Sequence, residues 1–373
     1  MSVGPSYSRT KMFGSIRSLY VDRFDFPKNQ KVCVLANGFI ENGHWYQVKI
    51  NGKSFCDFLN KLGYDVHVLS FYPQKLLFES KSQSTDISFS KIVCKLLPAY
   101  HERLAQKYKH IHYLGHSYGA TLLLAFLMGY EPTDNPMNKS NFAANKNLAK
   151  QNQTNVLSFT SLSGFYGLNW DFFETNYFSP INLIKSFGLN RKKLTFEGTI
   201  IKPIIRKLPN VVPYLPTDFF YAIKYFPLKN SVGEILSKLV PQTMVPFIYR
   251  KNVDVKAFTE AITYGSYRES WETLDTMLSI EKKRNFAKPW KSNALRSFNK
   301  DLGNLRLPSL FVQGEKDIIT PVNIIEKRAY ERIGSRKKEF ITLKETGHQD
   351  ILTPKDPRPL QQILGNWLSD VEA

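Results

Sequence analysis

The sequence Gly115-His116-Ser117-Tyr118-Gly119 reads G-x-S-x-G and lies between a short apolar run and a longer apolar segment. The run at 111–114 has strand character, and the alanine- and leucine-rich segment at 120–127 favours a helix. A tight turn between a strand and a helix lifts the serine above the end of a sheet, and the two glycines let the elements approach closely. The helix N-terminus also favours negative charge that develops beside it. Ser117 is therefore a candidate nucleophile.

A nucleophilic serine needs a base that removes its proton and an acid that orients the base. Downstream, an apolar strand at 307–312 runs into a turn that carries Asp317. A second strand at 339–343 is followed by the loop that contains His348. Ser117, Asp317 and His348 thus each follow a predicted strand, at the carboxyl ends where open α/β sheets place active sites. This order predicts a nucleophile, an acid and a base.

Other roles are open to the acid and to the base. Asp317 can simply form the turn or cap the helix that follows it. Glu315 is the rival acid in the same turn, and Asp350 and Asp301 are weaker rivals. His348 can be an ordinary loop histidine.

Acyl transfer also needs two backbone N–H groups that face the oxygen on which negative charge develops. We expect one of them from Tyr118, the residue after the nucleophile. The apolar run at 32–36 predicts a buried strand, and Asn37-Gly38-Phe39 follows it directly. The N–H of Phe39 is the candidate second donor, although Asn-Gly is also a common simple turn.

Four residues are expected to line the substrate site. Two of them have an alternative role in packing. Trp45 can pack in the core, and the side chain of His116 points away from that of Ser117 on an extended chain, so it is expected to pack under the turn rather than act as the base. The four residues are Asn37, Gly38, Trp45 and His116.

These motifs together resemble the α/β-hydrolase fold superfamily of serine hydrolases. The resemblance rests on Ala36-Asn37-Gly38-Phe39, the stretch 58–68, the G-x-S-x-G motif, Gly314-Glu315-Lys316-Asp317 and Gly347-His348. It implies an α/β-hydrolase fold, with a mostly parallel sheet flanked by helices and a large, mainly helical cap insertion.

Within the superfamily, the stretch 37–64 is most similar to the acid-lipase and polyhydroxyalkanoate-synthase branches. The synthases carry cysteine where this chain has Ser117, so ester hydrolysis is preferred over polymerisation. At Asn37 the chain departs from the histidine that is common in the family.

The resemblance also implies a division of the chain. Residues 1–164 and 301–373 are expected to form the α/β-hydrolase core, and residues 165–300 a cap, or lid, over the active site. The insertion is rich in aromatic residues, which can form its own small core or the wall of an apolar pocket for an acyl chain. These residues include Phe165, Tyr166, Trp170, Phe172, Phe173, Tyr177, Phe178, Tyr214, Phe219, Phe220, Tyr221, Tyr225, Phe226, Phe247 and Tyr249.

Composition bears on partners and on compartment. The 373 residues carry 51 lysines and arginines against 32 acidic residues, a formal net charge of +19. Such an excess is expected to favour peripheral contact with anionic membranes, whereas no motif points to nucleic acid. The first residues lack the apolar core of a signal peptide and no apolar run is long enough to span a bilayer, so a cytoplasmic location is expected.

Several features of other protein classes are not found in the sequence. It contains no metal-ligand spacing and no phosphate-binding loop, so no metal or other cofactor is expected. Cys33, Cys56 and Cys94 are scattered, which favours reduced packing cysteines. The Asn- and Lys-rich segment 131–155 is expected to be a long surface loop.

The expected activity is hydrolysis of carboxylic esters, most of all acyl lipids as in lipases, esterases and lysophospholipases. A thioesterase or an amidase is the alternative on the same scaffold, whereas epoxide chemistry normally needs an aspartate in place of Ser117. A catalytically silent module that binds lipid or a protein partner is another alternative. A further one is a secreted bacterial effector that acts on host lipids.

Overall fold

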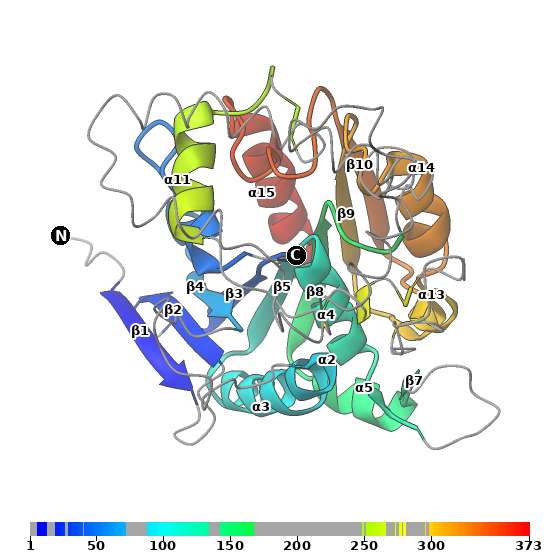
Figure 1. Cartoon of the computed structure of the whole chain (residues 1–373). Helices are drawn as coiled ribbons and strands as arrows, with labels where there is room; N and C mark the ends of the chain where they lie inside the picture. Colours follow the sequence, from blue (N-terminus) through cyan, green and yellow to red (C-terminus); the bar gives the residue numbers. More distant parts are fainter. Residues whose placement is uncertain are drawn as a thin grey trace, which may run out of the picture.

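A computed structural model gives the fold of the chain (Figure 1). It describes residues 6–12, 19–26, 29–39, 41–71, 88–133, 142–167, 248–249, 251–265 and 298–373, together with Thr273, Thr276, Met277, Ser279, Ile280 and Leu295.

An eight-stranded sheet, in the order β1-β2-β4-β3-β5-β8-β9-β10, crosses the molecule. The pairs from β4 to β10 are all parallel, and only the pairs β1–β2 and β2–β4 are antiparallel. The strands are β1 (Ser6–Met12), β2 (Leu19–Asp25), β3 (Lys31–Ala36), β4 (Asp65–Ser70), β5 (His110–His116), β8 (Val156–Leu162), β9 (Ser309–Gly314) and β10 (Lys338–Leu343).

Helices cover both faces of the sheet, because its central strands are apolar on both sides. In β3, Val32 and Val34 face one core and Cys33 and Leu35 face the other, as the two-residue period of a strand requires. The first core includes α2 (Phe89–Lys91), the π-helix η3 (Ile92–Leu96), α3 (Leu97–Lys107), α4 (Tyr118–Leu127), α13 (Phe298–Asp301), the 3₁₀-helix η5 (Leu302–Asn304), α14 (Val322–Ile325) and the π-helix η6 (Glu326–Tyr330). The second includes the 3₁₀-helix η1 (Gly43–Tyr46), α1 (Phe55–Lys61), α11 (Val255–Gly265) and α15 (Arg358–Glu372).

The expected fold class is confirmed. The strand predicted at 111–114 lies within β5, and the helix predicted at 120–127 begins two residues earlier as α4. Because β3, β5, β9 and β10 belong to the parallel part of the sheet, their carboxyl ends lie along the same edge.

The segment 131–155 is not simply a loop, so that expectation was wrong for its described part. The strands β6 (Tyr130–Pro132) and β7 (Phe142–Ala144) form an antiparallel ribbon, and α5 (Lys146–Asn152) follows. The Asn145 side chain caps α5 by accepting from the N–H groups of Asn147 and Leu148. An asparagine that suggested a loop therefore serves as a helix cap.

The division into a core and a cap stays a prediction, because most of 165–300 lies outside the described residues. Of the aromatic residues named in the insertion, Phe165, Tyr166 and Tyr249 are described, and the first two are buried in the core of the sheet domain. Helix α11, which lies in this region, packs on η1.

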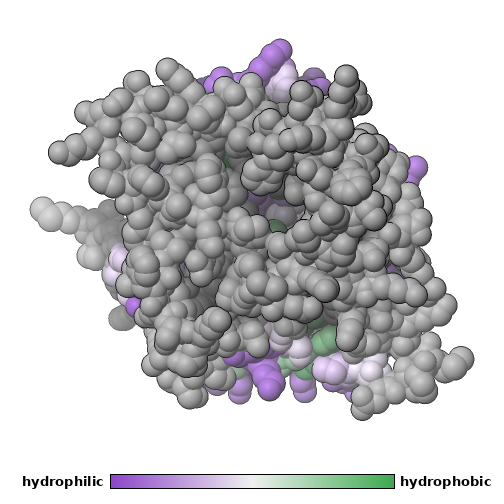
Figure 2. Space-filling model, viewed as in Figure 1, coloured by the Kyte–Doolittle hydropathy of each residue, from purple (hydrophilic) through white to green (hydrophobic). Residues whose placement is uncertain are grey.

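The surface described at the lower edge of the view, where α3 and α5 lie, is mainly hydrophilic with a small hydrophobic group (Figure 2). In the part of the chain that the structure describes, no helix combines the length and the hydrophobicity needed to cross a bilayer.

The carboxylate of Glu372 connects the last turn of α15 to the sheet. Glu372 accepts from Tyr64 Oη at 3.0 Å, lies 3.2 Å from His112 Nε2, and forms an ion pair with Lys31. Burial alone would raise the pKa of Glu372, but hydrogen bonds from His112, Lys31 and Tyr64 lower it to about 2. The ionised carboxylate therefore stabilises the folded state at every pH at which it stays ionised.

We expect Glu372→Gln to lower the free energy of unfolding at pH 7 by about 2 kcal/mol, the scale of hydrogen bonds to a charged group. Because the folded pKa is below the ordinary value of 4.5, the advantage of the natural protein is full above that value and fades as the pH falls towards 2. Urea unfolding at several pH values measures the difference.

Asp370→Asn is the matched control, since Asp370 is on the same helix and forms an exposed pair with Lys337. Equal losses of stability for the two variants would contradict this role of Glu372.

Candidate active site

The structure brings together the three residues predicted from the sequence. Ser117 follows β5, Asp317 lies in the turn after β9, and His348 lies in the loop after β10. His348 Nε2 is 2.8 Å from Ser117 Oγ, and His348 Nδ1 is 2.8 Å from Asp317 Oδ2. All three residues are buried, with exposed fractions of 5%, 3% and 2% for Ser117, Asp317 and His348. The hydrogen bonds run in the order that nucleophile, base and acid require.

Asp317 is held in place by the turn that carries it. Its Oδ1 accepts from the N–H groups of Ile319 and Thr320, and its Oδ2 accepts from Gln313 Nε2 and Thr320 Oγ1. Asp317 therefore does cap its own turn, as the alternative role suggested, and it presents the same Oδ2 to His348. The two roles are compatible, because a carboxylate has several acceptor sites.

The backbone of Ser117 is strained. Its φ of 49° and ψ of −124° lie in a region that residues with a Cβ rarely adopt. Its N–H donates to the carbonyl of Leu162, and its carbonyl accepts from the N–H of Phe165. These bonds to β8 and to the residues after it hold the turn in a conformation that costs about 1–3 kcal/mol.

The two glycines of the motif are needed for contact rather than for a positive φ. A Cβ on Gly115 would overlap the backbone of Ala120 in α4. A Cβ on Gly119 would overlap the carbonyl oxygens of Ala36 and Asn37, at the end of β3. Gly119 thus lets the start of α4 touch the loop in which the second N–H donor was predicted.

That loop turns tightly after β3. Asn37 Nδ2 donates to the carbonyl of Glu41 at 2.7 Å, and the N–H of Glu41 donates back to the carbonyl of Gly38. The N–H of Gly38 donates to Glu41 Oε2 at 2.6 Å. Asn37 therefore shapes the loop through its side-chain amide. The N–H groups of Phe39 and Tyr118 belong to the two segments that Gly119 brings together, and their role as oxyanion donors stays a prediction.

The rival acids have other partners. Glu315 has a side chain that is 43% exposed, pairs with Lys316 and accepts from the N–H of Glu345. Asp350 is buried but accepts from the N–H groups of Gly347 and Tyr249 and from Asn252 Nδ2, so it fastens the His348 loop to the residues before α11. Asp301 accepts from Tyr130 Oη.

Of the residues expected to contact substrate, Trp45 and His116 are engaged inside the protein. Trp45 is 4% exposed and packs edge-on against Phe258 of α11, with ring centroids 5.9 Å apart. This favours its packing role. His116 is fully buried and lies between Glu41 Oε2 and the carbonyl oxygen of His348.

Glu41 is the residue of this site that sequence reasoning missed. It is 1% exposed and is the only acidic residue between Ala36 and Ile50. An isolated acid just after a predicted oxyanion loop was the available signal, but its partner His116 is far away along the chain.

No arrangement of three or more His, Cys, Asp or Glu side chains suited to a metal ion occurs among the described residues.

Comparison with known proteins gives a similarity in structure alone. No family model matches the sequence, and no curated protein matches it either. A soluble variant of monoglyceride lipase from Saccharomyces cerevisiae, solved with a substrate analog, has a TM-score of 0.53 at 10% identity. The match covers 100% of this chain and 97% of the lipase chain. The monoacylglycerol lipase of Paleococcus ferrophilus has a TM-score of 0.52 at 15% identity, covering 95% and 99%.

A thermophilic esterase from Thermogutta terrifontis has a TM-score of 0.50 at 11% identity, covering 99% of this chain and 100% of its own. At such identities the similarity shows the fold only. The chain has the α/β-hydrolase fold.

A comparison of Asp317→Asn with Glu315→Gln tests which of these two acids orients His348. An amide in place of the Asp317 carboxylate would offer an N–H or a neutral oxygen to His348 and disturb its tautomer, so the rate at which a fluorophosphonate labels Ser117 is expected to fall about a thousand-fold or more. Glu315→Gln breaks an exposed pair, and its labelling rate is expected to stay within about two-fold of the natural protein. The reverse result would make Glu315 the acid.

Proposed function

We propose that the protein is a serine hydrolase that cleaves carboxylic esters, with acyl lipids as the preferred class of substrate. The observation that carries the proposal is the continuous chain of hydrogen bonds from Ser117 Oγ through His348 to Asp317, on a strained turn at the carboxyl edge of the sheet. The two lipases and the esterase with similar structures support the choice of ester chemistry.

The geometry suits acylation of Ser117. His348 Nε2 accepts the proton of the Ser117 hydroxyl while Oγ attacks the ester carbonyl carbon, and Asp317 stabilises the imidazolium that forms. Backbone N–H groups at Phe39 and Tyr118 are the proposed partners of the oxyanion. The tetrahedral intermediate collapses when His348 returns the proton to the leaving alcohol, which leaves an ester between the acyl group and Ser117.

Deacylation repeats these steps with water. His348 removes a proton from the water as its oxygen attacks the acyl carbonyl, and the proton then passes to Ser117 Oγ as the carboxylic acid leaves. The same steps would cleave a thioester or an amide, which are the alternative substrates of the scaffold.

Ser117→Ala is expected to lower the hydrolysis of p-nitrophenyl acyl esters by about ten-thousand-fold or more, because the attacking oxygen is lost. Ser158→Ala is a matched control, since Ser158 is also a buried serine whose Oγ lies 2.8 Å from a histidine, His112 Nδ1. Ser158→Ala should keep the kcat of the natural protein. Full activity of Ser117→Ala would remove the proposal.

A panel of esters, thioesters and amides of rising acyl length, with and without detergent, tests the substrate class. A preference for long-chain esters at an interface supports a lipase. A preference for thioesters or amides would replace the ester in the proposal.

We also propose that the protein makes peripheral contact with anionic membranes, which the net charge of +19 supports. Sedimentation with phosphatidylserine vesicles should show binding at low ionic strength that falls as salt shortens the Debye length from about 30 Å at 0.01 M to about 8 Å at 0.15 M. Vesicles of phosphatidylcholine alone are the control. Absence of binding to anionic vesicles at low salt would exclude this contact.

A further inference from the structure

One buried pair, Glu41 and His116, connects the loop after β3, the end of β5 and the loop that carries His348. Glu41 comes from the turn after β3, and His116 is the last residue of β5. Glu41 Oε2 accepts from the N–H of Gly38 at 2.6 Å and lies 3.0 Å from His116 Nδ1. On its other side, His116 Nε2 lies 3.1 Å from the carbonyl oxygen of His348. The pair therefore links the backbone of the oxyanion loop to the backbone of the proposed base.

The surroundings of the pair favour its ionised form. Burial alone would raise the pKa of Glu41, but the charge and hydrogen bond of His116 and the N–H of Gly38 hold that pKa below its ordinary value. Burial alone would lower the pKa of His116, but the charge and hydrogen bond of Glu41 outweigh it, and the carbonyl of His348 adds to the rise.

In the imidazolium, both ring nitrogens of His116 carry a proton, so both can donate to the acceptors that they face. An ionised His116 can thus donate to Glu41 Oε2 and to the carbonyl oxygen of His348 at the same time.

His116 contacts the proposed base directly. The rings of His116 and His348 have centroids 5.3 Å apart, and the hydrogen bond reaches the main chain of His348 itself. At the other end, Gly38 is the neighbour of Phe39, the proposed oxyanion donor. Loss of the pair would leave both the base and the donor loop free to shift, and a shift of about 1 Å at reacting atoms can cost a hundred-fold in rate.

We propose that Glu41 and His116 are positioning residues, which fix the oxyanion loop and the His348 main chain relative to Ser117. This rests on the proposed function. Neither side chain exchanges a proton with substrate, because the acceptors and donors they face are groups of the protein. Their effect is transmitted through Gly38 and His348.

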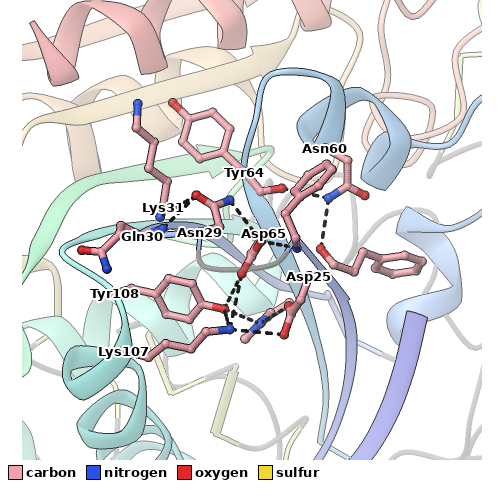
Figure 3. Close-up of polar contacts among 12 residues, drawn as sticks. Asp25, Asn29, Gln30, Lys31, Asn60, Tyr64, Asp65, Lys107 and Tyr108 are labelled. Atoms are coloured by element: carbon pink, nitrogen blue, oxygen red, sulfur yellow. Dashed lines mark hydrogen bonds and ion pairs between the residues drawn. The ribbon is translucent and has the colours of Figure 1, made fainter. Parts of the chain in front are cut away.

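A second pair of a histidine and a carboxylate provides a control at the opposite end of the sheet: His67 is buried and Asp25 is partly buried. His67 Nε2 lies 2.8 Å from Asp25 Oδ1, and Asp25 also pairs with Lys107. Figure 3 shows Asp25, Asp65, Lys107 and Tyr108 joined in one network beside the amino end of β4. This network contains a histidine and a carboxylate like the first pair, but it is remote from the carboxyl ends of the strands that carry the proposed site.

The experiment compares Glu41→Gln, His116→Gln and the double variant with Asp25→Asn, by steady-state kinetics on a p-nitrophenyl ester and by thermal unfolding. We expect Glu41→Gln to lower kcat at least about ten-fold with KM within about two-fold, since placement of the reacting groups is disturbed rather than substrate binding. The double variant should lose no more than the worse single variant, because the two residues act as a unit. Asp25→Asn should lower Tm but keep kcat.

Glu41→Asp keeps the charge on a shorter side chain and is expected to recover part of the lost kcat. It also provides a measurement if Glu41→Gln does not fold. A folded Glu41→Gln that keeps the natural kcat and loses only Tm, as Asp25→Asn does, would overturn the inference. If the natural protein itself neither cleaves esters nor reacts with a fluorophosphonate, the proposed function fails instead.

Discussion

The close approach of Gly119 to the carbonyl oxygens of Ala36 and Asn37 is the contact on which the arrangement of the site depends. It lets α4 begin directly beside the end of β3, so the serine turn and the predicted oxyanion loop meet at one edge of the sheet. A side chain at this position would push the two segments apart. The strain at Ser117 is tolerated because hydrogen bonds to β8 and its continuation hold the turn on the other side.

A serine, a histidine and an acid that are hydrogen-bonded in this order do not by themselves form an active site. A second such series in the same molecule shows this. Ser158, His112 and Glu372 form a second serine, histidine and acid series, with His112 Nδ1 2.8 Å from Ser158 Oγ and His112 Nε2 3.2 Å from Glu372 Oε1. Ser158 is fully buried within strand β8. Ser117 instead stands on a strained turn before a helix N-terminus, where its oxygen projects beyond the sheet.

The resemblance of the motifs to the α/β-hydrolase superfamily predicted the fold class. Local sequence predicted the places of Ser117, Asp317 and His348, because each lies in a short motif after an apolar strand. It did not reveal Glu41, whose partner His116 is brought close only by the pairing of β3 with β5. It also misjudged 131–155, where Asn145 caps a helix instead of forming a loop. Polar residues are ambiguous in a sequence, because the same side chain can satisfy a turn, a helix end or a buried partner.

The central claim is that an acyl group passes through Ser117. The most direct test mixes the protein with a slowly turned-over ester, stops the reaction with acid in its first phase, and locates the added mass by peptide mass spectrometry. The account predicts one acyl group on the peptide that contains Ser117. An ester that is consumed with no acyl group on that peptide, or with the acyl group on another residue, would contradict it.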